Sequence, residues 1–425
     1  MKKLLSVIVL GCLVLGPAAN CACASEIDIL VRKLVEKKVL TAGEAQQILT
    51  ETKEEVRKEL AKGESYSVPK WTQNIKVKGD IRTRYQYQKR KGDATSVTAD
   101  QTRGRIRLRA GAEPKVNEKV TAAFGLASGN DGESRSTNQT FTDNFAKKPI
   151  WIDYAYATYT PYDWVSLTGG RMINPIWQTG DMLWDTDINP EGLACVLKYE
   201  AAPSLQLFAN NAFFVLDEAS GDKSDPFMIA AQPGFKWDVI KDKMFLKGAF
   251  TYYVTGSVKS DSVLDQRSSR VGNTTIGAGA ATRYMYDYDS LAASLQLGFK
   301  EPLGPSFAFI PYADIFGDYI YNPDPSDDNI GWLIGGTIGS QKIKKWGDWQ
   351  AKYMYRNLER DCWLDTYPDS DFYAGATNVK GHEAAITIGL MENVTFGFDY
   401  YYAKYITGAF KRPESLYQCD LVLKF

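Results

Sequence analysis

The stretch "RGRIRLRAG", residues 103–111, decides the fold of this chain. Arginine occupies every second position from Arg103 to Arg109, and Ile106 and Leu108 stand between the last three arginines. A period of two is typical of a β-strand, because successive side chains point to opposite faces of a sheet. We therefore predict a strand with one charged face and one apolar face.

A second stretch, residues 75–90, shows the same alternation. One parity carries lysine, aspartate, arginine and glutamine side chains, among them Arg82 and Arg84. The other parity carries mainly apolar and tyrosine side chains, such as Ile81 and Tyr85. A soluble sandwich and a nucleic-acid-binding sheet would both satisfy this description, so the rest of the chain has to decide between classes.

The composition argues against a general affinity for nucleic acid. The formal net charge of the 425 residues is −1 at pH 7, so no global positive charge would recruit a polyanion. Aromatic residues make up 13% of the chain, and there are 35 glycines. These proportions are typical of a protein rich in strands and turns, and they would suit the aromatic girdles of a membrane barrel.

The N-terminus predicts export. The chain begins with two lysines, continues with an apolar run over residues 4–15 and then has small residues at 22–24. This order is that of a secretory signal peptide, so we predict that residues 1–24 are removed. Three cysteines then remain, and this odd, widely spaced set argues against a disulfide framework: they are Cys195, Cys362 and Cys419.

Residues 25–65 differ in pattern from everything downstream. Their apolar side chains recur at helical spacing among many lysines and glutamates, and Thr41 and Glu44 form a T-x-x-E capping box. We predict a periplasmic helical or coiled-coil segment. Whether it serves as a solvated spacer or as an oligomerisation stalk stays open, because the heptads are few.

The rest of the chain predicts a membrane barrel. No stretch beyond the leader approaches the roughly 18 consecutive apolar residues of a transmembrane helix, and strands can cross a bilayer only as a closed barrel. Roughly sixteen strand-like segments follow, with short turns and long polar loops in alternation. We therefore predict an all-β membrane protein, a closed antiparallel transmembrane β-barrel of about 16 strands over residues 70–425. Two segments, 204–217 and 306–320, alternate poorly, and we assign no faces to them.

Two motifs carry a family resemblance. The last strand, residues 416–425, keeps one apolar parity and ends in Phe425, which resembles the terminal signature that the barrel-assembly machinery reads in bacterial outer-membrane proteins. The stretch "GGRMINPIWQTGDMLWDTDINPEG" at 169–192 is the most particular piece. On these motifs the chain resembles the putative porin family of Gram-negative bacteria. It is similar in plan to the phosphate-selective porins, which also carry an N-terminal helical segment.

The resemblance implies an outer-membrane porin, a water-filled channel for the passive diffusion of small hydrophilic solutes or ions. It also implies that the loop 172–190 folds inward as a constriction loop. The expected partners are outer-membrane lipid and lipopolysaccharide, the barrel-assembly machinery, small hydrophilic or anionic solutes and further copies of the chain in a homotrimer, with no nucleic acid.

In such a barrel the arginines would face the aqueous lumen, and the acidic groups of the loop 172–190 would face them across the narrowest point. The arginines line one wall over several residues, so we predict a modest preference for anions; the alternative is that they only form structural salt bridges. Arg171 has the lipid-facing parity, so a bulge at Gly169-Gly170 would be needed to turn it inward. Phe425 is the predicted assembly signal, and the predicted pore-lining residues are Arg82, Arg84, Arg103, Arg105, Arg107, Arg109, Arg171, Asp181, Asp185 and Asp187.

Two other classes of function fit the sequence less well. A secreted or surface all-β carbohydrate-binding protein would use the aromatic side chains to stack on sugars, but the terminal phenylalanine and the alternation of short and long connections argue against it. An enzyme is disfavoured, because the only histidine, His382, shares the parity of apolar neighbours. No cysteine or histidine cluster has metal-ligand spacing, so we predict no metal and no cofactor.

Overall fold

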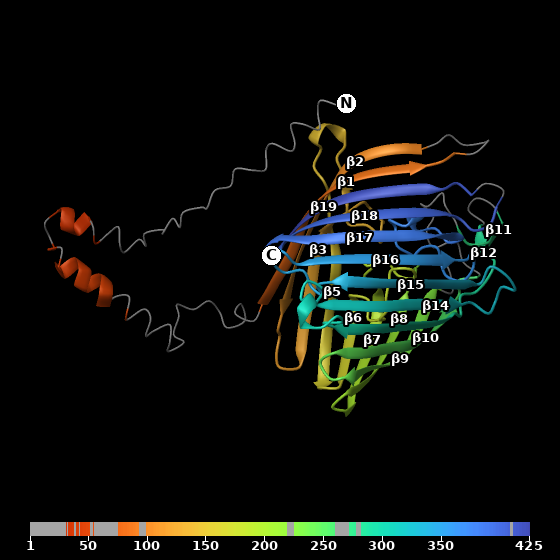
Figure 1. The fold of residues 1–425 in the computed structure, drawn as a ribbon, viewed down its shortest axis with the longest axis horizontal. Coiled ribbons are helices and arrows are strands. Elements are labelled where there is room, and N and C mark those ends of the chain that lie inside the picture. Colours follow the sequence, from red (N-terminus) through yellow and green to blue (C-terminus); the bar gives the residue numbers. More distant parts are fainter. Residues whose placement is uncertain are drawn as a thin grey trace. The chain divides into compact units, whose positions relative to one another are not determined.

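A computed structural model describes residues 75–425 except 93–98, 219–224, 260–271, 278–281 and 409–410, and near the N-terminus residues 31, 33–37, 40, 41, 43–51 and 54. Its main body is a closed antiparallel β-barrel (Figure 1). The sheet counts 17 strands among the described residues, but one of them, β4 (Gln139–Thr140), is only two residues long, so 16 strands build the wall. This confirms the predicted fold class.

The barrel strands are β1 (Ile75–Arg90), β2 (Ala99–Pro114), β3 (Val120–Ser128), β5 (Ile150–Tyr162), β6 (Val165–Arg171), β7 (Glu191–Ala202), β8 (Leu205–Val215), β9 (Phe227–Ile240), β10 (Met244–Gly256), β13 (Leu291–Lys300), β14 (Tyr312–Tyr321), β15 (Ile330–Gly339), β16 (Trp349–Leu358), β17 (Val379–Met391), β18 (Val394–Tyr405) and β19 (Glu414–Lys424). Outside the barrel wall lie β11 (Thr275–Ile276), β12 (Arg283–Tyr284) and the short 3₁₀ helices η2 (Asp143–Phe145), η4 (Pro305–Phe307) and η5 (Tyr373–Gly375).

The first and last strands close the barrel. The pairing of β1 with β19 runs from Asp80 opposite Lys424 to Arg90 opposite Glu414. One residue further, Gly79 and Phe425 exchange two backbone hydrogen bonds, with N···O distances of 2.9 and 3.0 Å. The phenylalanine ring also covers Gly79, where a Cβ atom would lie only 2.5 Å from it. The C-terminal residue is therefore part of the closing seam.

The two faces of β2 lie as the alternation predicts. Arg105 and Arg107 are each 8% exposed and face the inside of the barrel, where they form polar contacts. Leu108, between Arg107 and Arg109 in the sequence, is 37% exposed on the outside. An apolar outer surface with the charges inside is what a membrane barrel requires.

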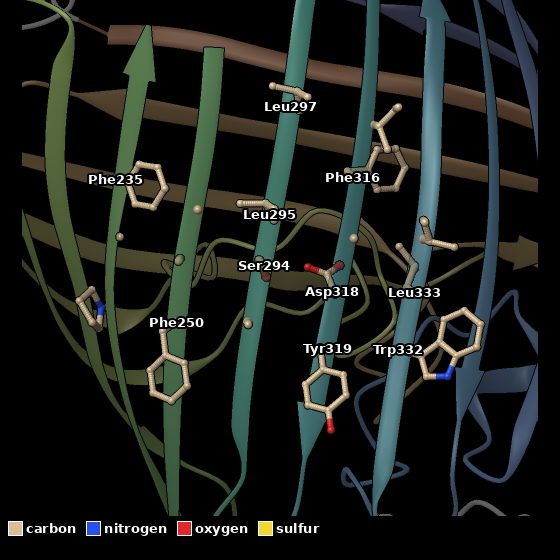
Figure 2. Close-up of a pocket in the computed structure, with 18 of the residues that line it drawn as sticks. Phe235, Phe250, Ser294, Leu295, Leu297, Phe316, Asp318, Tyr319, Trp332 and Leu333 are labelled. Carbon is tan, nitrogen blue, oxygen red and sulfur yellow. The ribbon is translucent and has the colours of Figure 1, made fainter. Parts of the chain in front are cut away.

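The outer wall over β8–β10 and β13–β15 contains a broad apolar depression of about 1060 Å³ (Figure 2). Glycines such as Gly234 and Gly248 form part of its floor, and Phe235, Leu295 and Trp332 stand around it. Leu295 is 52% exposed and Trp332 is 39% exposed. These side chains belong to the face that lipid would contact, so we do not treat the depression as the functional site.

The inside of the barrel is partly filled by an apolar core, which explains the poorly alternating segments. On β8, the inward Ala212 and Phe214 pack in this core, and on β14 so do Phe316 and Ile320. Both faces of these strands are therefore partly apolar. The predicted strand 306–320 was placed too early, because the structure has η4 and a turn before β14 begins at Tyr312.

The chain divides into two compact units, Met1–Gln73 and Asn74–Phe425. Residues 43–51 are helical, and the predicted capping box is confirmed: the Thr41 amide and hydroxyl donate to the Glu44 carboxylate over 2.9 and 2.7 Å. None of the described helices combines the length and the apolar character needed to span a bilayer. The predicted signal peptide, residues 1–24, lies outside the described residues.

Candidate functional site

The loop 172–190 lies inside the barrel, where its backbone is held by polar side chains of the wall. Gln232 on β9 is fully buried; its amide accepts a hydrogen bond from the Trp177 N–H and donates one to the Trp177 carbonyl, each over 2.8 Å. Asp318 on β14 accepts hydrogen bonds from the backbone N–H groups of Thr179 and Gly180, over 3.1 and 2.9 Å. The loop's apolar side chains pack into the interior core: Met172, Ile176, Met182, Leu183, Trp184 and Ile188.

A second loop, residues 359–378, packs against the first. The Trp363 indole donates a hydrogen bond to the Leu183 carbonyl over 2.7 Å, and the Tyr367 ring stacks on Trp184 with centroids 4.6 Å apart. The Asp185 N–H donates to the Tyr367 carbonyl over 2.7 Å. The alternation of strands and long polar loops gives no sign that this loop lies inside the barrel, so its position was not predicted from the sequence.

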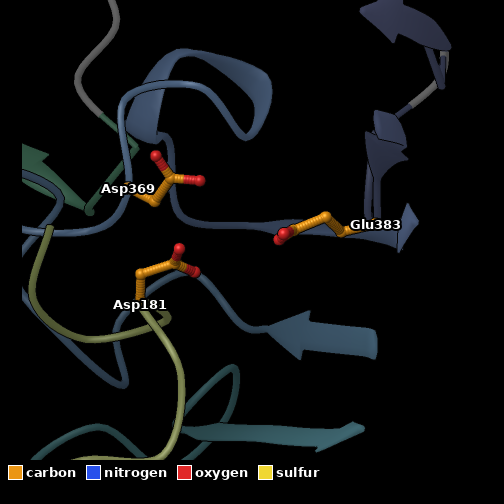
Figure 3. Close-up of side chains that lie close together, drawn as sticks. All are labelled: Asp181, Asp369 and Glu383. Atoms are coloured by element: carbon orange, nitrogen blue, oxygen red, sulfur yellow. The ribbon is translucent and has the colours of Figure 1, made fainter. Parts of the chain in front are cut away.

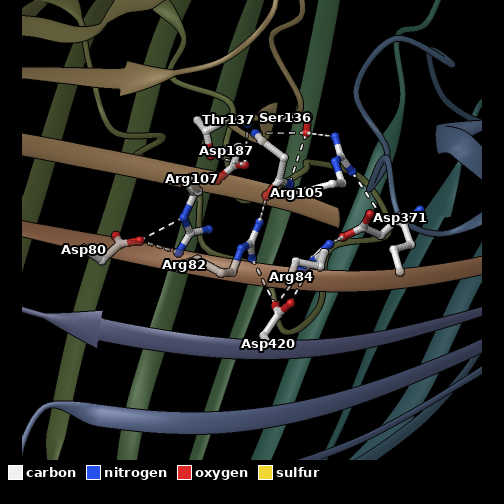
Figure 4. Close-up of polar contacts among 12 residues, drawn as sticks. Asp80, Arg82, Arg84, Arg105, Arg107, Ser136, Thr137, Asp187, Asp371 and Asp420 are labelled. Atoms are coloured by element: carbon white, nitrogen blue, oxygen red, sulfur yellow. Dashed lines mark hydrogen bonds and ion pairs between the residues drawn. The ribbon is translucent and has the colours of Figure 1, made fainter. Parts of the chain in front are cut away.

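The arginine side chains of β1 and β2 form a wall that faces these loops (Figure 4). The register places Arg84 directly opposite Arg105, and Arg82 directly opposite Arg107. Cross-strand neighbours of like charge repel each other, so such a wall needs nearby anions. We call the six arginines the arginine wall: Arg82, Arg84, Arg103, Arg105, Arg107 and Arg109.

Four of the six arginines have carboxylate partners. Asp80 of β1 lies 2.7 Å from Arg107 and 2.8 Å from Arg109. Asp420 of β19 lies 2.7 Å from Arg84 and 3.5 Å from Arg82. The two loops supply the other contacts, since Asp371 lies 2.8 Å from Arg84 and Asp187 lies 3.2 Å from Arg109.

Arg103 and Arg105 form no ion pair with a carboxylate in the described part of the chain. Arg105 reaches the Ser136 hydroxyl and the Gln86 amide, each over 3.3 Å, and its buried Nε has no partner. The Gln86 amide can also be turned so that its oxygen accepts from Arg103. A buried guanidinium with only neutral partners, such as that of Arg105, is a costly arrangement. Because neither residue is neutralised by a described carboxylate, Arg103 and Arg105 carry the surplus positive charge of the wall.

The three predicted acidic residues of the loop 172–190 have different surroundings. Only Asp187 contacts the arginine wall, where it also accepts hydrogen bonds from the Thr137 N–H and hydroxyl. Asp185 is buried against the second loop and accepts a hydrogen bond from the Ser370 N–H over 2.8 Å. Asp181 points toward Arg356 on β16, at 3.4 Å. The prediction that all three aspartates face the arginines is therefore wrong, because only Asp187 does so.

The electrostatic surroundings of the loop carboxyls differ accordingly. Burial, together with the charge of Asp187, raises the pKa of Asp185 to about 8. Burial also disfavours the charged form of Asp371, but the nearby Arg84 charge and its hydrogen bond outweigh this and lower the pKa of Asp371 to about 2. Asp371 is thus a permanent anion beside the arginine wall at neutral pH.

Arg171 keeps its outward parity. The pairing of β5 with β6 matches Ala155 with Arg171 and Tyr156 with Gly170 without a register shift at this point, so the expected bulge is absent. The Arg171 guanidinium donates to the Glu191 carboxylate over 2.7 Å and to the Asp153 carbonyl over 2.8 Å.

Sequence reasoning missed Asp371 and the interior loop that carries it. Its partner Arg84 lies 287 residues earlier in the chain, and no local spacing signals such a contact. Asp80 and Asp420 were recognisable in part, because both share the lumenal parity of their strands.

Two cavities border Asp187. One, of about 360 Å³, is lined by Lys78 and Lys424 near the rim of short turns. The other, of about 300 Å³, is lined by Glu133 and Ser136, which belong to the long loop after β3.

Comparison with known proteins identifies the family and finds solved structures of similar fold. A family model described as "Putative porin" matches residues 88–285 and 275–425. The high-pH structure of Pseudomonas putida OprB is 8% identical, with a TM-score of 0.53 over 83% of this chain and 95% of that chain. Two mutant structures of the Rhodopseudomonas blastica porin are 12% and 13% identical, with TM-scores of 0.44 and 0.43, and each covers 83% of this chain and 100% of its own. No curated protein matches the chain.

Proposed function

This chain belongs to the porin family, and we propose that it forms an outer-membrane channel for passive diffusion of small hydrophilic solutes, with a modest preference for anions. The family and the closed barrel support the channel itself. The preference rests on one observation, the charge balance of the arginine wall.

The arginine wall carries more positive charge than its neighbours neutralise. Six arginines face four carboxylates within ion-pair distance, which leaves a surplus of two positive charges. Guanidinium groups stay charged at any working pH. At physiological salt the screening length is about 8 Å, so only charges next to the constriction sort the passing ions. Arg103 and Arg105, which have no carboxylate partner in the described part of the chain, lie on that wall, and this favours anions.

Reconstitution in a planar bilayer tests this function. We expect discrete conductance steps and, in a KCl gradient, a reversal potential displaced modestly toward the equilibrium potential of chloride. A chain that inserts and gives no conductance would contradict the channel. A reversal potential on the potassium side would contradict the anion preference and leave the channel intact.

The assembly of the protein is also part of the proposal. Residues 1–24 would direct export, and the barrel-assembly machinery would read the terminal strand that ends in Phe425. The apolar outer wall would contact outer-membrane lipid and lipopolysaccharide, and the barrel would associate as a homotrimer. The closing position of Phe425, bonded to Gly79, supports its role as an assembly signal.

The alternative functions have less support. A carbohydrate-binding surface would need accessible aromatic side chains, but many of the exposed aromatics, such as Phe250 and Trp332, lie on the outer wall, where the membrane would cover them. We expect no enzymatic activity, because His382 lies among tyrosines and its Nδ1 is 2.7 Å from the Tyr353 hydroxyl, with no described nucleophile beside it.

A further inference from the structure

Three carboxylates meet inside the barrel, away from the arginine wall. Asp181 comes from the first interior loop, Asp369 from the second and Glu383 from the wall strand β17. One ligand oxygen from each lies within 4.8 Å of the other two. Figure 3 shows the three carboxylates pointing toward one common space. We call these residues the carboxylate cluster.

Two of the three residues, Asp369 and Glu383, are buried, and the cluster is incompletely paired. Glu383 is 1% exposed; one carboxylate oxygen meets the Lys352 ammonium, and the other, Oε2, has no hydrogen-bond partner among the described residues. Arg356 is 2% exposed and makes long contacts to Asp181 and Asp369, at 3.4 and 3.5 Å. An orphaned carboxylate oxygen in a buried site points to a missing ligand, because native proteins rarely leave such groups unsatisfied.

The local charge also calls for a cation. The three carboxylates face two cationic side chains, Lys352 and Arg356. Three carboxylates against two cations leave an excess of one negative charge, which a bound cation would offset.

The donor set selects a hard cation. All three ligands are carboxylates, with no histidine or cysteine, which disfavours zinc and copper. Three oxygens within 4.8 Å of one another can share one large cation at the centre of their triangle. Calcium–oxygen distances are about 2.3–2.6 Å, whereas magnesium requires about 2.0–2.1 Å and near-ideal octahedral geometry.

We propose that Asp181, Asp369 and Glu383 bind one calcium ion, which ties both interior loops to the barrel wall. The ion has a structural role, since it joins three segments that are far apart in the sequence. Waters complete its coordination, because calcium takes about 6–8 oxygen ligands. The site does not depend on the direction of ion selectivity, and a channel without it remains a channel.

The test uses the full chain refolded in detergent, free of lipopolysaccharide, because lipid phosphates also bind divalent cations. Calcium chloride is titrated calorimetrically, and terbium luminescence is excited through tyrosine, since Tyr401 is paired with Glu383 across β17 and β18. We expect one calcium per chain, competition between calcium and terbium, and a higher midpoint of heat denaturation in calcium than in EDTA.

Matched variants distinguish the site from general acidity. Asp369→Asn with Glu383→Gln should abolish stoichiometric binding and the calcium-dependent shift in midpoint. These changes remove like-charge repulsion, so the variant should fold without calcium; should it not fold, the single Asp181→Asn variant gives the same readout. Asp314→Asn is the control, because this inward-facing carboxyl of β14 lies outside the cluster, and it should bind calcium like the parent.

Two results would overturn the proposal. In the first, the parent protein binds neither calcium nor terbium, and the cluster variant is more stable than the parent both in calcium and in EDTA. The carboxylates of the cluster would then be protonated and would bind no metal ion. The other is a loss of binding in Asp314→Asn equal to the loss in the cluster variant.

Discussion

The Arg84 guanidinium on β1 lies 2.8 Å from the Asp371 carboxylate of the second interior loop. The same guanidinium also contacts Asp420 on β19, so one arginine joins the closing strand of the barrel to a loop within it. The contact explains how the loop 359–378 is held against the arginine wall. It also neutralises one of the charges that passing ions would meet.

Asp371→Asn should increase the preference for anions, because it removes a negative charge from the arginine wall. The reversal potential in a salt gradient would move further toward that of chloride. The loss of folding free energy should stay below the roughly 3–5 kcal/mol typical of breaking a buried ion pair, because Asp420 remains beside Arg84. An unchanged reversal potential would show that Asp371 lies outside the ion path.

The Arg84–Asp371 contact should also persist in mild acid. The pKa of Asp371 is lowered to about 2, so the stabilisation is complete above the unfolded value near 3.9 and is lost only as the pH falls toward 2. We expect the effect of Asp371→Asn on the reversal potential to be the same at pH 7 and at pH 5. An effect that vanished at pH 5 would contradict the ion pair.

Arg105 and Arg107 should contribute differently to selectivity. Arg105 has no carboxylate partner among the residues that the structure describes, whereas Arg107 is paired with Asp80 at 2.7 Å. Arg105→Ser removes unpaired charge and should move the reversal potential toward cations while barrel stability changes little. Arg107→Ser leaves Asp80 with Arg109 alone and should mainly lower stability. Equal shifts from both variants would mean that pairing does not decide selectivity.

Trp184→Ala should loosen both interior loops without opening the barrel wall. The indole contacts Phe214, Trp363 and Tyr367, so its removal leaves a cavity that costs about 3–5 kcal/mol. Single-channel records should show larger and noisier conductance, and heat-modifiable migration should confirm an intact barrel. Trp332→Ala, on the outer wall, is the matched control and should leave the records unchanged.

Phe425→Asp should impair assembly, because a carboxylate would replace a ring that covers Gly79 at the closing seam. We expect less heat-modifiable barrel in outer membranes and more aggregated protein in the periplasm. Phe425→Tyr keeps the ring and should assemble like the parent. Normal amounts of barrel from the aspartate variant would remove the basis for an assembly signal.

Deletion of residues 25–65 should leave the conductance of each channel nearly unchanged, because these residues belong to a compact unit separate from the barrel. Cross-linking of the deletion variant then distinguishes the two roles left open above. Fewer trimers would indicate an oligomerisation stalk, and unchanged trimers a spacer. A correctly inserted variant with no conductance would show that the segment takes part in the channel.

The sequence by itself determined the wall of the barrel. The side of the sheet that a strand residue faces is set by its position relative to its immediate neighbours, so the parity of Arg105, Arg107 and Leu108 could be predicted from the stretch 103–111. The same local rule failed on β8 and β14, where interior loops pack against the wall and make the inner face apolar as well.

Only the tertiary structure decided which charges meet. Asp181, Asp185 and Asp187 lie close together in the sequence, yet they contact three different parts of the molecule. Arg84 meets Asp371 across 287 residues, and Asp369 meets Glu383 because a loop and a wall strand converge. Alternation along a strand specifies which face of the sheet a side chain occupies. The partner of that side chain depends on how the loops fold back into the barrel. The packing of Trp184, Trp363 and Tyr367 sets that arrangement of the loops.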